Sequence, residues 1–432
     1  MRAIQTFEVL AARADHDGLI DVELRALMDM AYPLSWSCSQ RSLQVLERAL
    51  RLSAQQEDPL LRARTRVRCF AFRLWQGWNP QDAEEFHKAF AEILNTDDRR
   101  ILTPYLADCG FISWMSSEYA EARRSLSESR IIQFDTLEEN PYLSSPDIFG
   151  QHVVVPINLL FLGEWGEALR EFKDQIAILD KNALYNWGQV AHLNRAWLHL
   201  QAMDFAGVLA ICSSVLPLVR DPELRPAPDH PTPIPAAFRN RLILTGSAET
   251  ALGNYESALE HLLAARAEMD RLAIIFNWYW RIRLESALTE LWLAKGDLAQ
   301  ARTHAESFLK TALATAEHTW QALAWEMNAR VAMAELDLTR AQDCIAKGLF
   351  AMEGFEVPLA AWRVHATAAE LYRRMKSRDL AERQLALSRE TIMKLANSLP
   401  AEEPLRHVFL SAPKIRKILG EGEAPKSRAK KA

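Results

Sequence analysis

A short phrase recurs along the chain about every forty residues, and this repeat limits the folds that the sequence can adopt. Residues 162–169 read Leu-Gly-Glu-Trp-Gly-Glu-Ala-Leu, and residues 252–259 read Leu-Gly-Asn-Tyr-Glu-Ser-Ala-Leu. Weaker copies extend the series to nine turns, near positions 37, 78, 117, 163, 203, 253, 296, 336 and 378. A period of this length predicts a solenoid, in which each repeat buries its apolar face against its neighbours.

The composition of the phrase indicates what each repeat contains. The glycine or small polar residue suits the end of a helix, where the backbone needs a positive φ. The Asp, Asn or Glu that follows can cap the next helix. The alanine further on lets two helices approach closely, and it stands at Ala83, Ala122, Ala168, Ala258, Ala301 and Ala341. Because apolar residues elsewhere recur at helical spacing, we expect an all-α chain of stacked helical hairpins.

The phrase resembles the mid-hairpin turn of tetratricopeptide repeats. Gly246, seven residues before Gly253, matches the first-helix glycine of that family, and Trp325 matches its early tryptophan. The resemblance implies a right-handed superhelical solenoid of roughly nine hairpins. Repeats of this length are similar to those in the arms of large bacterial signalling ATPases and transcription regulators. No G-x-x-x-x-G-K-[ST] string occurs in the chain, so we expect a detached arm or an array with a separately encoded partner.

The prolines divide the array. Seven of the 19 prolines lie in residues 217–235, which we expect to form a loop insertion between N-terminal hairpins (1–216) and C-terminal hairpins (236–397). The insertion is either a tolerated loop or an extended docking segment. Residues 398–419 are expected to form a capping helix, and residues 420–432 a basic disordered tail.

Charge and cysteine content argue against several classes of protein. The net charge is −5 and no basic stripe precedes the tail, so nucleic acid is not an expected partner. The five cysteines lie at least 31 residues apart, which fits neither a zinc site nor a disulfide framework. No signal peptide or 18-residue apolar run occurs, so we expect a soluble cytoplasmic protein with no membrane association.

No catalytic motif accompanies the repeats. The chain lacks H-E-x-x-H, G-x-S-x-G, paired C-x-x-C and dinucleotide-binding glycine patterns. We therefore expect no enzyme activity, no cofactor and no metal site. The aromatic cluster around Trp278 and Trp280 is interpreted as core, with a binding patch as the alternative.

The resemblance also suggests where a ligand would bind. In tetratricopeptide arrays the first helix of each hairpin lines the concave groove, and counting back from the turns gives the candidates Trp197, Asn240, Ser247, Arg283, Glu290 and Arg330. The family's set of lysines and asparagines for a terminal carboxylate is absent, since Ile243 and Ser286 stand where a lysine is expected.

Function is expected to follow from binding. The leading hypothesis is a regulatory interaction scaffold in bacterial signal transduction or transcription control, with an ATPase, cyclase, kinase or DNA-binding output domain as partner. The alternative is a sensor arm that binds a small effector in the groove, and an RNA-binding helical repeat is less favoured. The N-terminal helix, with Ile4, Phe7, Val9 and Leu10, is expected to support self-association.

Overall fold

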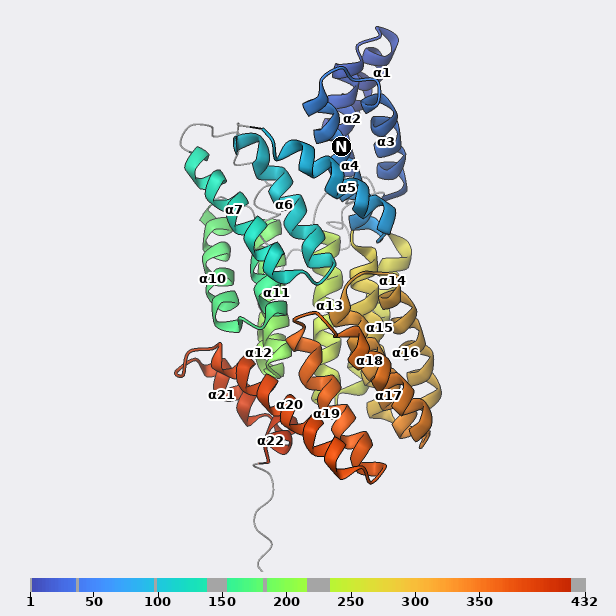
Figure 1. Ribbon diagram of the computed structural model, residues 1–432, viewed down its shortest axis with the longest axis vertical. Coiled ribbons are helices and arrows are strands. Elements are labelled where there is room, and N and C mark those ends of the chain that lie inside the picture. The colour runs from blue at the N-terminus through green and yellow to red at the C-terminus, as the bar shows by residue number, and fades with distance from the viewer. Residues whose placement is uncertain are drawn as a thin grey trace, which may run out of the picture.

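The computed structural model describes residues 2–35, 39–96, 99–137, 154–181, 185–215 and 234–420. These residues form 21 helices (Figure 1) and no strand. The helices are α1 (Arg2–His16), α2 (Ile20–Ser35), α3 (Ser39–Ser53), α4 (Pro59–Gln76), α5 (Pro80–Ile93), α6 (Arg99–Met115), α7 (Tyr119–Leu137), α9 (Val154–Leu162), α10 (Trp165–Lys181), α11 (Tyr185–Gln201), α12 (Phe205–Ser214), α13 (Ile234–Ala251), α14 (Tyr255–Arg271), α15 (Asn277–Lys295), α16 (Leu298–Leu313), α17 (His318–Ala334), α18 (Leu338–Ala351), α19 (Pro358–Arg374), α20 (Arg378–Asn397), α21 (Pro404–Ser411) and α22 (Pro413–Leu419).

Most of the described helices pair as hairpins. Each of the first helices α2, α4, α6, α9, α11, α13, α15, α17 and α19 packs against the helix that follows it. Eight of the nine turns between paired helices lie in the described residues, and each falls within two residues of a position expected from the repeat. The turn between α2 and α3 lies outside them. The prediction of an all-α solenoid of roughly nine hairpins is confirmed.

Seven of the turns share one backbone pattern. The first or second residue after the first helix has a positive φ, between 61° and 86°, at Ser117, Gly163, Met203, Gly253, Gly296, Leu336 and Lys376. The next amide donates to a carbonyl five residues earlier, as from Asn254 N to Glu249 O at 2.9 Å. This is the Schellman motif, which satisfies carbonyls at the end of a helix. Four of the seven positions hold a residue with a side chain, for which this backbone conformation is costly.

Because of this strain, substitutions at two of these turns should change the free energy of unfolding in opposite directions. Leu336 has φ 65° and an 80% exposed side chain, so Leu336→Gly should raise the free energy of unfolding by about 0.5–1 kcal/mol. Gly253 has φ 84° and open space around it, so Gly253→Ala should lower that free energy by about 1 kcal/mol through the backbone alone. Urea unfolding of the two variants measures both effects, and changes of the same sign would contradict the assignment.

Small residues allow the helices of a hairpin to touch, as the sequence predicted. Ala258 and Ala301 have no exposed surface. A Cβ atom on Gly246 would lie 2.7 Å from Leu262 Cγ and 3.0 Å from the Ala258 carbonyl oxygen. These distances are shorter than atomic contacts allow, so the first-helix glycine is required where α13 crosses α14.

The solenoid curves until its two halves meet, which the sequence analysis did not anticipate. Turns and helix ends of the N-terminal hairpins bond to loops of the C-terminal hairpins. The bonds are Ile275 N to Ser35 O (2.9 Å), Phe276 N to Trp75 O (3.0 Å), His318 N to Ser117 Oγ (2.7 Å) and Trp165 N to Ser398 Oγ (3.0 Å). Gly166 lies at the last of these contacts, where an added Cβ would be 2.3 Å from Ser398 O. The array is therefore closed across its concave side.

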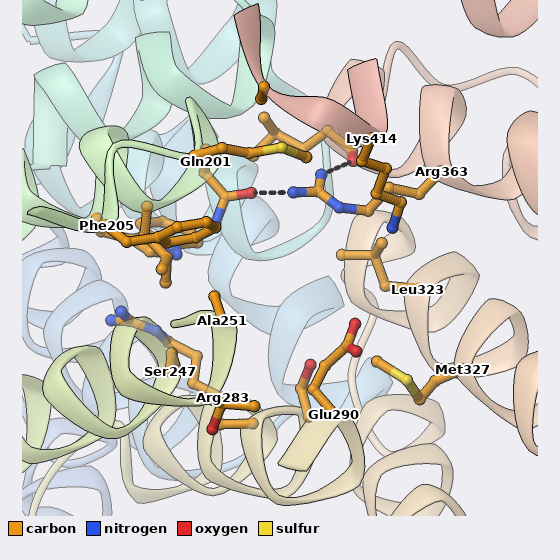
Figure 2. Close-up of a pocket in the computed structure, with 18 of the residues that line it drawn as sticks. Gln201, Phe205, Ser247, Ala251, Arg283, Glu290, Leu323, Met327, Arg363 and Lys414 are labelled. Carbon is orange, nitrogen blue, oxygen red and sulfur yellow. Dashed lines mark hydrogen bonds between the residues drawn. The ribbon is translucent and has the colours of Figure 1, made fainter. Parts of the chain in front are cut away.

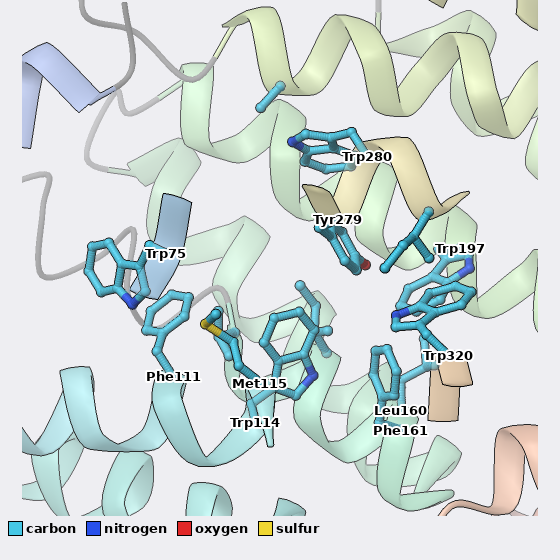
Figure 3. Close-up of a cluster of buried hydrophobic side chains, with 14 of the residues drawn as sticks. Trp75, Phe111, Trp114, Met115, Leu160, Phe161, Trp197, Tyr279, Trp280 and Trp320 are labelled. Atoms are coloured by element: carbon cyan, nitrogen blue, oxygen red, sulfur yellow. The ribbon is translucent and has the colours of Figure 1, made fainter. Parts of the chain in front are cut away.

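A buried aromatic cluster fills part of the interior between the halves (Figure 3). Its rings come from α4, α6, α9, α11, α15 and α17, and ring centroids lie 5.1 Å apart for Phe161 and Trp197 and 5.5 Å apart for Trp114 and Tyr279. Tyr279 and Trp280 are both buried in it. The interpretation of this aromatic group as core agrees with its place in the structure.

The N-terminal helix is only partly covered. It packs on α2 and buries Ile4, so this residue is not available to a partner as the sequence analysis had expected. Val9 and Leu10 remain 69% and 41% exposed. Self-association through this helix stays a prediction.

The C-terminal segment differs from the single capping helix expected over 398–419. It contains two short helices, α21 and α22, which meet at Ala412 in an extended conformation (φ −60°, ψ 133°). Pro413 disfavours helical backbone in the residue before it, which explains the break. Phe409 is fully buried and packs against Trp165 with ring centroids 5.0 Å apart, so this segment is joined to α10 and not only to the last hairpin.

Two expected irregular segments lie mostly outside the described residues. Residues 217–233 of the proline-rich insertion and residues 421–432 of the tail belong to this undescribed part. The predicted insertion extends two residues too far at its C-terminal end, because α13 already begins at Ile234. Pro235 is compatible with the first turn of a helix, where no amide donor is needed.

Candidate functional site: a central cavity

A cavity of about 880 Å³ lies inside the curved array, next to the aromatic cluster (Figure 2). Six consecutive first helices, α9 to α19, and the two C-terminal helices line it. Its apolar residues include Phe161, Trp197, Leu200, Met203, Phe205, Ile243, Trp320, Leu323, Met327 and Leu359, and its charged residues are Arg283, Glu290, Glu326, Arg363 and Lys414. A concave, mainly apolar site with a few polar groups is typical of a ligand-binding cavity.

Aromatic rings form one wall of the cavity. Trp197 of α11 and Trp320 of α17 stack with ring centroids 6.0 Å apart and planes inclined by 13°. Both rings are also part of the buried cluster, which fixes their position. Rigid aromatic side chains offer a large contact area at low entropic cost to a bound ligand.

The two carboxylates of the cavity are already engaged. Both oxygens of Glu290 accept from the Arg330 guanidinium, with the Nη2 to Oε2 distance at 2.7 Å. Glu326 accepts from Thr367 Oγ1 at 2.6 Å and lies 3.9 Å from Arg330 Nε. Burial raises the pKa of Glu290, but the charge and hydrogen bonds of Arg330, together with the charges of Lys414 and Arg363, lower the pKa to about 2. Glu290 is thus ionised, and its charge is balanced within the protein.

Arg283 of α15 is charged and buried, and its polar neighbour is the Tyr279 hydroxyl rather than a carboxylate. Its side chain is only 4% exposed, and no described protein atom accepts from either terminal nitrogen. The guanidinium lies 4.6 Å from the centre of the Trp197 ring, a cation–π contact. Burial lowers its pKa. Buried donors are nearly always satisfied, so an unpaired guanidinium beside a cavity is unusual.

Arg363 and Lys414 lie together on another side of the cavity (Figure 2). Arg363 donates to two neutral acceptors, Gln201 Oε1 at 2.9 Å and Leu359 O at 2.6 Å. Lys414 faces Trp362, with Nζ 5.5 Å from the ring centre. Among the described residues, no carboxylate forms an ion pair with either side chain.

Lys414 also lines a second hollow of about 610 Å³, and it is the lining residue that the two spaces share. Its wall includes Arg330, Arg374 and Lys417. The two spaces therefore both border α22.

The six groove candidates have different positions. Trp197, Ser247, Arg283 and Glu290 line the cavity. Arg330 lines the second hollow and reaches Glu290.

Asn240 does not face the groove, contrary to the expectation from the repeat. It is buried and its amide donates to Asn194 Oδ1 at 3.3 Å. Because α13 packs on α11 in this region, the face of α13 that carries Asn240 is directed at α11.

Sequence reasoning missed Gln201, Arg363 and Lys414. The repeat register could have pointed to Arg363, which occupies a first helix like the other candidates. Nothing in the repeat indicates Lys414, because α22 follows the last hairpin and reaches the cavity only through the folding back of the C-terminal segment.

The described residues hold neither a metal-binding cluster nor a membrane-spanning helix. No group of three or more His, Cys, Asp or Glu side chains is placed to hold a metal ion. No helix in the described part of the chain combines the length and the apolar character needed to cross a membrane.

Comparison with known proteins identifies the architecture. No protein-family model and no curated protein sequence matches the chain. Among solved structures, the chain is similar to a Rap protein complexed with competence and sporulation factor, with 14% identity, a TM-score of 0.60, and coverage of 87% of this chain and 99% of that one. It is also similar to the APC/C hetero-tetramer Cut9–Hcn1, with 14% identity, a TM-score of 0.51, and coverage of 95% and 72%. The fold is that of a tetratricopeptide-repeat solenoid.

Within this tetratricopeptide-repeat solenoid, the cavity occupies the concave side, where the first helices of successive hairpins face inward. Closure between the halves turns what would be an open groove into a partly enclosed space. The geometry suits binding of a ligand that touches several repeats at once.

Proposed function

We propose that the chain is a binding protein that holds an extended segment of a partner protein in its central cavity, and that it acts as a regulatory arm in bacterial signal transduction or transcription control. The observation that carries the proposal is the cavity itself, with six consecutive first helices around about 880 Å³ of mainly apolar space. The Rap protein of the same fold was solved in complex with competence and sporulation factor, which supports a bound factor as the ligand.

A regulatory role follows from the way in which the cavity is built. A ligand inside it would touch α9 of the N-terminal half together with α15, α17 and α22 of the C-terminal half. Such a ligand binds the closed superhelix better than an opened one and shifts the population toward it. An ATPase, cyclase, kinase or DNA-binding output domain that contacts the array then responds to the change in its curvature.

A small effector is the second candidate, since the cavity volume lies within the range of small-molecule sites. The second hollow, which shares Lys414 with the cavity, favours a longer ligand. An extended peptide can occupy both spaces, whereas a compact effector fills only one.

The proposal is tested by selection from a phage-displayed library of random octapeptides. Ala251 lines the cavity with exposed surface, so Ala251→Trp should occlude the site without disturbing the core. Ala264→Trp places the same ring on the exposed side of α14 and serves as the matched control. We expect enriched peptides to bind the unaltered chain and the Ala264→Trp variant with equal affinity, and to bind the Ala251→Trp variant at least about tenfold more weakly, or 1.4 kcal/mol. Peptides that ignore Ala251→Trp, or no enrichment at all, would overturn the proposal.

A further inference from the structure

The cations that line the cavity outnumber the carboxylates available to them. Among the described residues, Arg283, Arg363 and Lys414 form no direct ion pair with a carboxylate, although Glu290 and Glu326 attract Arg363 and Lys414 from a longer distance. The two carboxylates of the cavity, Glu290 and Glu326, are engaged by Arg330 and Thr367. The chain as a whole carries a net charge of −5, so the positive character of this interior is a local feature.

Of the three cations, Arg283 has the strongest need of an anionic partner. A guanidinium with 4% exposure that has only the Tyr279 hydroxyl and aromatic rings beside it, and no carboxylate, is costly in a folded protein unless an anionic partner binds. A carboxylate matches its planar fork with two parallel hydrogen bonds. The neighbouring Trp197 ring can contact apolar atoms next to that carboxylate.

The cations lie on separate sides of the cavity. Figure 2 places Arg283 on one side and Arg363 with Lys414 on the other, with Glu290, Met327 and Leu323 along the wall that joins them. A compact anion with one charge could satisfy only one of these groups. Two anionic groups on one extended ligand, with apolar groups between them, match the whole arrangement.

We infer that the segment bound in the cavity is an acidic peptide, with one side-chain carboxylate at Arg283 and a second at Arg363 and Lys414, separated by apolar residues. The inference rests on the proposed function, because it specifies the ligand of the same cavity. Single-stranded nucleic acid is disfavoured, since such ligands need a continuous basic groove with exposed stacking surfaces, whereas this site is a partly enclosed apolar cavity.

The test uses peptides from the octapeptide selection whose binding is lost in the Ala251→Trp variant. These sequences should be enriched in pairs of Asp or Glu. Each selected peptide is synthesised with its acidic residues replaced singly by Gln or Asn, and binding is measured by fluorescence anisotropy. One replacement should weaken binding to the unaltered chain about 30-fold or more, the lower range for losing one partner of a buried charge pair.

A double-mutant cycle tests whether the acidic peptide residue whose replacement weakens binding is the one that contacts Arg283. The Arg283→Met variant should bind the acidic peptide about 30-fold more weakly, and the amide replacement at the paired position should then have little additional effect. Arg363→Met should show the same coupling with the second acidic residue. Lys310→Met removes a positive charge from an exposed position on α16 and should leave the affinity unchanged.

A stability measurement separates ligand binding from a structural role for Arg283. Because its charge is buried and unpaired in the free chain, Arg283→Met should not lower the melting temperature, whereas a structural arginine should. Cavity-dependent peptides that lack acidic residues, or affinities indifferent to Arg283→Met, would overturn the inference and leave the proposed function standing. If no peptide depends on the cavity for binding, both the inference and the proposed function are rejected. Equal binding of single-stranded DNA as a competitor would assign the cations to nucleic acid and also reject the inference.

Discussion

Replacing Glu317 with alanine should lower the free energy of unfolding by about 3–5 kcal/mol, because several buried donors lose their acceptor at once. Glu317 has no exposed surface and lies just before α17. Its carboxylate accepts from Ser117 Oγ at 3.0 Å, from the Tyr119 hydroxyl, and from Trp320 N at 2.7 Å. Two of these donors belong to the N-terminal half of the chain, so the substitution also weakens closure.

Chemical denaturation measures the loss, and Glu353→Ala is the matched control. Glu353 is exposed in the turn after α18, and its removal should change stability by no more than about 0.5 kcal/mol. Hydrogen exchange gives a local readout, since the His318 amide donates to Ser117 Oγ at 2.7 Å and should exchange faster in the Glu317→Ala variant. Equal stability of the two variants would mean that this contact does not hold the halves together.

The same carboxyl group makes stability depend on pH. Burial raises the pKa of Glu317, opposed by the hydrogen bonds from Tyr119 and the Trp320 amide. A carboxyl whose pKa is higher in the folded chain contributes its stability fully below the ordinary value of 4.5, and that contribution is lost as the pH rises through the raised value. The stability of the unaltered chain relative to Glu317→Gln should therefore decrease as the pH is raised from 4.5.

The hairpins could be predicted from the sequence because their signals are local. In seven of the turns a positive-φ residue is followed directly by a polar residue, and in six of these seven a buried alanine stands four residues after the polar one. The closure of the array across its concave side has no such local signal in the sequence. The contacts of Ser35 with Ile275 and of Trp165 with Ser398 join residues more than 200 positions apart, and no pattern in either segment announces the other.

The candidate site shows the same division. Counting from the turns placed Trp197, Ser247 and Arg283 on the concave side, where the structure has the cavity. The count treats a first helix as having one inward face, so it could not separate Asn240, whose face is covered by α11. Lys414 depends on the folding back of α22, which is a tertiary event outside the repeat.

The buried side chain of Arg239 is a second position where a substitution should strongly destabilise the fold. Its side chain has no exposed surface, and it joins α13 to the end of α14 and the beginning of α15. The guanidinium donates to the carbonyls of Glu268 (3.2 Å) and Leu272 and to Asn277 Oδ1 at 3.0 Å. Burial lowers its pKa to about 10, so the group remains charged at neutral pH. The last carbonyls of a helix need partners, and a cation there also interacts favourably with the helix dipole.

Arg239→Met should therefore lower the free energy of unfolding by about 3–5 kcal/mol, since buried acceptors at the end of α14 lose their donor while the apolar volume is largely kept. Arg239→Lys should recover only part of the loss, because one ammonium cannot replace a planar fork with three acceptors. Arg378→Met, at an exposed position on α20, should change stability by no more than about 0.5 kcal/mol. The loop after α14 also carries Ile275, whose amide bonds to Ser35 of the N-terminal half, so Arg239→Met should speed hydrogen exchange of that amide. An Arg239→Met variant as stable as Arg378→Met would show that α14 ends without needing this side chain.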